Sequence, residues 1–304
     1  MNKTDIHVHA AVRRIPFSGG NPMDPESHYI CDPEEMMETL KEQQITKAIL
    51  MSSGEGPVEG VHSLGAYNSD CRQIAEESGG WFSWMCGIDP DDPDTVEDRM
   101  RMYRDQGAVG VGEVMVNQWL DSPYMSAVFA AAEKLHMPVL CHMSPEEGYS
   151  YGAADRAGLP LLEKTLRKYP ELIFIGHSQV FWMEISGDCP KEGNRERSGF
   201  GRGPVQAGGT IERLFDSYPN LYADLSAYSG SCAIMRDERY GLYFLNKYQD
   251  RLMFGTDTFN RRTRFPLAEY LETKMKDGVL SREACEKIFT GNAEKLFFNH
   301  KHEE

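Results

Sequence analysis

The sequence lacks the patterns that identify several common classes of protein. Its seven cysteines are dispersed and include no Cys-x-x-Cys pair, so we expect reduced thiols in the cytoplasm rather than disulfides or a zinc finger. No apolar run approaches about eighteen residues, so no transmembrane span is expected, and residues 1–10 are interpreted as a core strand rather than a signal peptide. Linkers, repeats and low-complexity segments are also absent, so residues 1–304 are predicted to form one domain.

Positive charge is scarce as well. The 32 Lys and Arg residues are outnumbered by 47 Asp and Glu residues, which gives a formal net charge of −15. Such a chain repels phosphate backbones and anionic membranes unless it carries a strong local basic patch. We therefore expect a small-molecule substrate, and neither a nucleic acid nor a membrane, as the partner. The sequence leaves a homo-oligomer open.

What the sequence does contain is a regular alternation of apolar runs and helical segments. The runs 48–51, 138–141 and 172–175 are continuously apolar, as expected for strands buried on both faces. The pairs Asp32-Pro33 and Ser122-Pro123 are typical of helix starts. Strands are predicted near residues 4–10, 46–53, 81–88, 108–116, 138–143, 172–177, 221–225 and 251–256.

Eight strands that alternate with helices predict a parallel sheet in an α/β protein. We predict that this sheet closes into a single (β/α)8 TIM barrel, a fold that typically uses about 250 residues and tolerates insertions. A doubly wound open sheet is the main alternative. The connections 11–31 and 178–209 follow strands one and six and are too long for simple turns. Both therefore lie on the face where barrel active sites are built, and we expect them to serve the site unless they are tolerated surface insertions.

Candidate metal ligands recur at the ends of these strands. His7 and His9 are two residues apart on the first strand, so their side chains point to the same face. The ends of strands four, five, six and eight carry Glu113, His142, His177 and Asp257. Each residue alone could be structural, as an ion-paired glutamate, a hydrogen-bonded core histidine or a capping aspartate. Together they would crowd one small volume with uncompensated polar groups, and a divalent metal ion that prefers such ligands resolves this crowding.

The combined motifs resemble the amidohydrolase superfamily of metal-dependent TIM-barrel enzymes. Residues 291–297 (GNAEKLF) are similar to the G-N-A-x-x-L-F signature of its amidohydrolase 2, or amidohydrolase-related, branch. Residues 254–257 (FGTD) match the F-G-[ST]-D motif on strand eight of that branch. The resemblance covers essentially the whole chain, from residue 5 to residue 297.

The resemblance implies a ligand set for this chain. A first metal ion would be held by His7, His9 and Asp257. His142 and His177 would complete a second site, or would orient the reactive water of a one-metal enzyme. The expected ion is Zn²⁺, with Mn²⁺ and Fe²⁺ as alternatives, at one or two ions per chain.

Glu113 departs from part of the family pattern. Decarboxylases of this branch usually lack a carboxylate on strand four, and many binuclear members have a carboxylated lysine there. Glu113 is similar to the bridging glutamate of TatD-like binuclear hydrolases, which favours two ions and hydrolysis. We therefore expect a hydrolase that cleaves a C–O or C–N bond of a lactone, ester or cyclic amide with metal-activated water.

Asp257 and His177 are the predicted catalytic residues. Asp257 would accept a proton from the water and deliver it to the leaving group. The main alternative is a decarboxylase or hydratase of the same branch, which would use one metal ion and the strand-six histidine, here His177, to handle protons. The third hypothesis, a catalytically inactive metal-binding scaffold, would require a missing ligand or base, and none is missing.

Arginines near the strand ends predict a small anionic substrate, because a guanidinium binds carboxylate or phosphate through a bidentate fork. These arginines are Arg261, Arg262 and Arg264 after strand eight, Arg195, Arg197 and Arg202 after strand six, and Arg13 and Arg14 after strand one. Trp182 and Tyr228 are expected to line the substrate pocket. The alternative is that the arginines are solvated or paired with the many acids and that the two aromatic residues serve packing.

Overall fold

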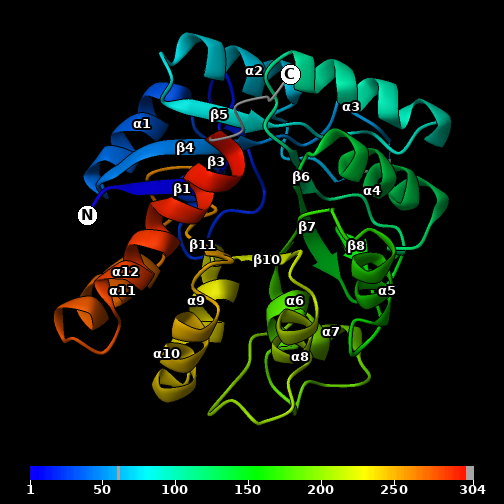
Figure 1. The fold of residues 1–304 in the computed structure, drawn as a ribbon. Helices are drawn as coiled ribbons and strands as arrows, with labels where there is room; N and C mark the ends of the chain where they lie inside the picture. Colours follow the sequence, from blue (N-terminus) through cyan, green and yellow to red (C-terminus); the bar gives the residue numbers. More distant parts are fainter. Residues whose placement is uncertain (60–61, 299–304) are drawn as a thin grey trace.

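The computed structural model describes residues 1–59 and 62–298, so the last residues of the predicted domain 1–304 lie outside the described part. It shows parallel strands in the middle of the molecule with helices on the outside (Figure 1). The barrel strands are β1 (Lys3–Val8), β4 (Ile45–Met51), β5 (Phe82–Met85), β6 (Val111–Val114), β7 (Val139–Ser144), β9 (Phe174–His177), β10 (Leu221–Asp224) and β11 (Leu252–Met253). All eight predicted strands are therefore present, with ends that differ by a few residues.

These strands join into a ring in the order β1-β4-β5-β6-β7-β9-β10-β11. Parallel ladders connect β1, β4 and β5 and, separately, β6, β7, β9, β10 and β11. A parallel bridge between Cys86 and Val111 connects β5 to β6, and another between Val8 and Thr258 connects β1 to the segment after β11. The His9 N–H also donates to the Thr258 carbonyl at 2.9 Å. The fold is the predicted TIM barrel.

Several outer helices have capped N-termini or apolar faces that pack against the barrel. Asp32 and Ser122 cap α1 and α4 with side-chain oxygens that accept backbone N–H groups, as their sequence context predicts. On α8, Ile211, Leu214 and Phe215 lie on one face and are buried. The helices are α1 (Pro33–Glu42), α2 (Asn68–Glu77), α3 (Val96–Asp105), α4 (Pro123–Leu135), α5 (Pro160–Lys168), α6 (Gln179–Met183), α7 (Asn194–Arg197), α8 (Thr210–Ser217), α9 (Ala227–Met235), α10 (Glu238–Lys247), α11 (Leu267–Lys276) and α12 (Arg282–Glu286).

The two long connections are ordered rather than structureless. The connection after β1 contains a small antiparallel pair, β2 (Ile15–Pro16) with β3 (Tyr29–Ile30), and the 3-10 turn η1 (Pro25–Ser27). The connection after β9 contains α6 and α7. The remaining short elements are β8 (Ala153–Ala154), which pairs with β7, the 3-10 turn η2 (Pro93–Thr95) and the π-helical turns η3 (Lys287–Gly291) and η4 (Glu294–Phe298).

The interior of the barrel is filled with apolar side chains, and its far end is closed by the C-terminal segment. Ile6, Ile49, Met85 and Ile175 belong to one buried cluster that also includes Phe297. The Asn292 side chain donates to the backbone carbonyls just before and within β11, which holds this segment against the start of the strand. The signature at 291–297 is therefore structural here, and the opposite end of the barrel is free for chemistry. Within residues 1–59 and 62–298, no helix combines the length and apolar character that a membrane span requires.

Candidate metal centre

The predicted ligands converge at the C-terminal ends of the barrel strands. They are His7 and His9 at the end of β1, Glu113 on β6, His142 on β7, His177 on β9 and Asp257 just after β11. The side chains form overlapping groups whose potential ligand atoms lie within 4.8 Å of one another. All are buried except Asp257, whose side chain keeps 27% of its surface exposed. Asp257 is therefore the member of the set that is most open to a substrate.

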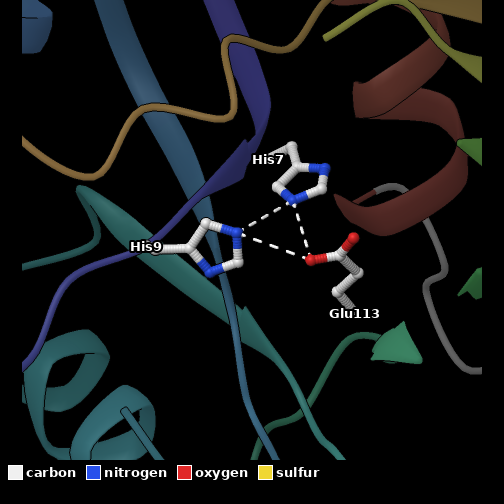
Figure 2. A group of neighbouring side chains, drawn as sticks. All are labelled: His7, His9 and Glu113. Atoms are coloured by element: carbon white, nitrogen blue, oxygen red, sulfur yellow. Dashed lines mark hydrogen bonds and ion pairs between the residues drawn. The ribbon is translucent and has the colours of Figure 1, made fainter. Parts of the chain in front are cut away.

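One side of the centre is formed by the two histidines of β1. The Nε2 atoms of His7 and His9 face each other at 3.1 Å. Oε2 of Glu113 lies 3.5 Å from His7 Nε2 and 3.6 Å from His9 Nε2 (Figure 2). Oδ1 of Asp257 lies 3.5 Å and 3.2 Å from the same two nitrogens. Two imidazole nitrogens and two carboxylate oxygens thus border one small volume.

The other side of the centre uses the second oxygen of Glu113. Oε1 lies 2.7 Å from His142 Nδ1 and 3.6 Å from His177 Nε2. His177 Nε2 is also 4.0 Å from Oδ2 of Asp257. Glu113 therefore stands between the two pairs of histidines, with one carboxylate oxygen toward each pair.

Asp224, at the end of β10, fixes two of the histidines from behind. Its Oδ2 lies 2.7 Å from His7 Nδ1 and 3.0 Å from His177 Nδ1, and it accepts the Ser226 hydroxyl at 2.6 Å. A carboxylate at Nδ1 holds the proton there and leaves the Nε2 lone pair directed into the centre, as metal-binding histidines require. Sequence reasoning missed Asp224 and Ser226. The available signal was a carboxylate at the end of the predicted strand 221–225.

Strand eight approaches the ligands closely because of its motif residues. A Cβ atom on Gly255 would lie 2.7 Å from Asp224 Oδ1 and 3.2 Å from His7 Cβ, so only glycine fits without a shift. Asp5 accepts both the hydroxyl and the N–H of Thr256, which ties β1 to this segment. Asp257 has a φ of 58° and donates its N–H to the His7 carbonyl at 2.8 Å. This left-handed conformation, which aspartate tolerates better than most residues, turns its carboxylate toward the histidines.

The electrostatics of the centre favour a bound cation. Burial alone would raise the pKa of Glu113, but hydrogen bonds from His142 and His7 hold it well below its usual range. Burial would lower the pKa of His7, yet Asp257, Asp224 and Glu113 together hold it well above its ordinary value. Three buried or half-buried carboxylates thus create a strongly negative site that no lysine or arginine among the described residues neutralises by an ion pair. A divalent cation suits this field.

One nitrogen beside the centre has no partner in the described part of the chain, unlike the Nδ1 atoms of His7 and His177. His9 Nδ1 is buried and has no hydrogen-bond partner among the described residues. A buried nitrogen without a partner is costly, and a ligating histidine ordinarily donates from its second ring nitrogen. The fit to the predicted ion rests instead on the donor set, because the His7 and His9 Nε2 atoms and the Glu113 and Asp257 oxygens are of the kinds that divalent ions prefer.

Two aromatic rings cover the centre on the side of His142. The Tyr151 ring stacks on His62 with centroids 4.1 Å apart and contacts His142 in a tilted arrangement with centroids 4.2 Å apart. Burial raises the pKa of the Tyr151 phenol. His62 comes from the connection after β4 and Tyr151 from the connection after β7. Sequence reasoning missed both, because their proximity depends on how two separate loops fold over the barrel.

The predicted substrate-binding residues after strand eight are not directed at the centre. Arg261 pairs with Glu35 and Glu38, Arg262 with Asp24 and Glu26, and Arg264 with Glu42. Arg14, after strand one, also pairs with Glu35. The structure thus places these guanidiniums in ion pairs with acids, as the alternative interpretation had it, while Arg13 is exposed.

The remaining candidates belong to the connection after β9 or lie close to it. Arg197 is buried and donates to the carbonyls of Pro145 and Asp155, so it holds two loops together. Trp182 is buried and donates its Nε1–H to the Asp224 carbonyl at 3.0 Å, which supports β10 beneath the centre. Tyr228 is half exposed and packs edge-on against Phe200. Arg195 and Arg202 are exposed and line a cavity in this region.

Comparisons with known proteins agree with the geometry. The family model described as Amidohydrolase matches residues 4–298, and the chain therefore belongs to this family, as its motifs predicted. No curated protein matches the chain. An uncharacterized TIM-barrel protein from Bordetella bronchiseptica has a similar structure, with a TM-score of 0.63, 18% identity and coverage of 97% of this chain and 98% of that one.

Two further solved structures show the same fold. A probable 2-pyrone-4,6-dicarboxylic acid hydrolase from Acinetobacter baumannii, with citric acid bound, has a TM-score of 0.58 and 16% identity over 98% of this chain and 99% of that one. A 5-carboxyvanillate decarboxylase from Novosphingobium aromaticivorans, with bound manganese, has a TM-score of 0.56 and 18% identity over 88% of this chain and 81% of that one. The family and these neighbours support an enzyme. Hydrolase and lyase names both occur among structures of this shape.

Proposed function

We propose that the protein is a metal-dependent hydrolase that cleaves a lactone, ester or cyclic amide of a small substrate bearing a carboxylate. The observation that carries the proposal is the position of Glu113. One of its oxygens faces His7 and His9, and the other faces His142 and His177. A carboxylate placed in this way can bridge two cations, which is the arrangement that favours hydrolysis.

In this proposal the residues of the centre have separate roles in metal binding, proton transfer and orientation. His7, His9 and Asp257 would hold one ion, His142 and His177 the other, and Glu113 would join them. Two bound cations, with Zn²⁺ as the expected metal, would lower the pKa of a water molecule and polarise the scissile carbonyl. Asp257, the exposed member of the set, would accept a proton at its carboxylate and return it to the leaving group. Asp224 keeps the rings of His7 and His177 in the orientation that this requires.

The names of two proteins with similar structures support the proposal that the substrate bears a carboxylate. The names 2-pyrone-4,6-dicarboxylic acid hydrolase and 5-carboxyvanillate decarboxylase both denote carboxylated rings. The stacked rings of His62 and Tyr151 offer a flat surface beside the centre on which such a ring could lie.

One observation favours the second candidate, a lyase with a single metal ion. The 2.7 Å contact between Glu113 Oε1 and His142 Nδ1 is a hydrogen bond, and it occupies the two atoms that a second ion would use. If this bond persists in the loaded enzyme, Glu113 and His142 would hold and move protons rather than a cation. Decarboxylation or hydration by the remaining ligand set would then be favoured.

Metal analysis of the purified protein separates the two candidates. We expect two ions per chain in the wild type and one in Glu113→Gln. The matched control is Glu184→Gln, a change in a buried glutamate that binds Gly158 N–H and Thr210 instead; it should retain two ions. One ion per chain in both the wild type and Glu113→Gln would contradict the bridging role.

Substrate screening gives the second part of the test. The loaded enzyme should hydrolyse carboxylated lactones faster than neutral lactones of the same ring size. Carboxylated phenols, assayed for release of carbon dioxide, test the lyase. Turnover of these phenols without any lactone hydrolysis would overturn the proposed function.

A further inference from the structure

A cavity of about 500 Å³ lies in the connection after β9, apart from the residues of the metal centre. The residues that line it include Met183, Cys189 and Phe200 and three arginines, Arg195, Arg202 and Arg236. We call it the arginine cavity. In Figure 1 this connection includes α6 and α7. Helix α6 packs against α9, and Arg236 lies at the C-terminal end of α9.

The walls of the arginine cavity are fixed by specific contacts. Arg236 donates to the carbonyls of Arg202 and Gly203 at 3.3 Å. A Cβ atom on Gly201 would lie 2.4 Å from the Arg236 guanidinium carbon, so the chain and the guanidinium are in close contact there. Cys232 on α9 contacts the Gly201 carbonyl as well. The loop that presents Arg202 is therefore held against α9 rather than free in solvent.

The chain around Ser186, another residue that lines the cavity, is held in a similar way. The Gly187 N–H donates to the Gln206 carbonyl at 2.9 Å, and the Ser186 hydroxyl accepts the Gln206 N–H at 2.8 Å. A Cβ atom on Gly187 would lie 2.1 Å from the Ala207 carbonyl oxygen. The two ends of the loop thus pack backbone to backbone. This gives the cavity a preformed shape, which lowers the entropic cost of binding a ligand.

Three arginines lie among the residues that line the cavity. Arg195 and Arg202 form no ion pair with any acid of the described residues, although the chain carries a net charge of −15. Two acids, Asp188 and Glu196, line the cavity as well, and neither forms an ion pair with these arginines among the described residues. Asp188 accepts the Ser186 hydroxyl at 2.6 Å, and the Glu196 carboxylate lies against the backbone of Gly193. The lining therefore carries three guanidinium groups and two carboxylates, which leaves an excess of positive charge at the cavity.

We propose that the arginine cavity binds a small oxyanion with two or more negative charges, a polycarboxylate or a phosphate. Guanidinium forks recognise these groups, and the apolar side chains of Met183 and Phe200 in the lining can contact a short carbon chain between carboxylates. The anion is either a separate ligand or the distal end of the substrate. The site stands on residues outside the metal centre, so it does not depend on the hydrolase proposal.

The test is titration calorimetry on the full-length protein with its metal retained, with tricarballylate and inorganic phosphate as probes, and KM is measured on the same preparations. Wild type should bind at least one probe saturably. Arg195→Ala/Arg202→Ala should bind it at least about tenfold more weakly, because each lost charged hydrogen bond is worth about a factor of ten or more. Arg261→Ala/Arg264→Ala removes the same two charges from ion-paired arginines and should bind like the wild type. Arg202→Gln, a milder change, should show an intermediate loss.

The outcomes separate specific binding from general electrostatics. Equal weakening in both double variants, or no saturable binding by the wild type, would overturn the proposal. If the double variant loses anion binding and also raises KM for a carboxylated substrate, the anion is part of that substrate. If it loses anion binding with KM unchanged, the anion is a separate ligand.

Discussion

The metal centre and the segment 261–264 are both dense groups of charged residues after barrel strands, but they differ in how their charges are satisfied. In the centre, the His7 and His9 nitrogens and the Glu113 carboxylate face a shared volume, and no lysine or arginine of the described residues pairs with them. In the segment, each of the three arginines has a carboxylate partner. A charged group that is already paired gains little free energy from binding a ligand, because it must first give up its partner. The first region is therefore suited to bind a cation, and the second to hold the surface together.

Asp257→Asn is expected to have the largest effect, because it removes the one exposed carboxylate of the centre. Turnover should fall by about 10²- to 10⁴-fold, the range for loss of a general acid–base group. Metal content must be measured in the same sample, since Asp257 is also a predicted ligand. Unchanged turnover with the metal retained would show that the proton is handled elsewhere, with His177 as the next candidate.

Asp224→Asn should weaken metal binding by about 10- to 100-fold, as loss of a carboxylate behind ligating histidines typically does. The change removes the charged oxygen that fixes both His7 and His177 while keeping the shape of the side chain. Competition with a chelator measures the affinity. The control is Asp155→Asn, in a buried carboxylate that binds three backbone N–H groups away from the centre. Equal metal affinity in wild type and Asp224→Asn would show that Asp224 does not contribute to metal binding.

The sequence predicted which histidines and carboxylates gather at the centre but not the residues that support them, for a physical reason. His7, His9, Glu113, His142 and Asp257 lie at strand ends, and parallel strands of a barrel bring their ends together whatever the details of packing. Asp224 also ends a strand, but its role depends on which histidines it faces, and that is set by the order of neighbours around the ring. Family membership and fold followed from motifs spread over the whole chain. Whether the residues at the centre bind an ion stays a prediction until metal is measured.

The partners of the arginines could not be predicted because they lie far away in the chain. Arg264 pairs with Glu42 and Arg262 with Asp24, each more than 200 residues distant. These acids come from α1 and from the connection after β1, which meets strand eight only when the barrel closes. A cluster of arginines in the sequence therefore could not distinguish a substrate site from a network of surface ion pairs. The same limit applied to Arg202, which lines a cavity and forms no ion pair with any acid in residues 1–59 and 62–298.

Glu35→Gln tests the ion-paired region around segment 261–264. It should lower the free energy of unfolding by about 1–2 kcal/mol at neutral pH, the range for a buried hydrogen-bonded charge. Burial alone would raise the pKa of Glu35, but Tyr29, Arg14 and the Arg261 N–H hold it below its ordinary value of 4.5. A carboxyl group with a lowered pKa stabilises the fold above its unfolded-state pKa and loses that contribution as the pH falls. Urea unfolding at a series of pH values should show the difference from wild type shrinking below about 4.5. A difference that grows toward acid pH would contradict this assignment.

Arg264→Ala should have the smallest effect, and for that reason it is the most direct test of the comparison. Both members of the Arg264–Glu42 pair are exposed, so the pair contributes about 0–1 kcal/mol to stability, and less at high salt. If the segment is a surface ion-pair network, turnover and KM for a carboxylated substrate should equal those of the wild type. A KM raised tenfold or more, with stability unchanged, would mean that the substrate displaces Glu42 and pairs with Arg264. The distinction drawn between the two regions would then fail, because a charge that is paired in the free protein would still serve the ligand.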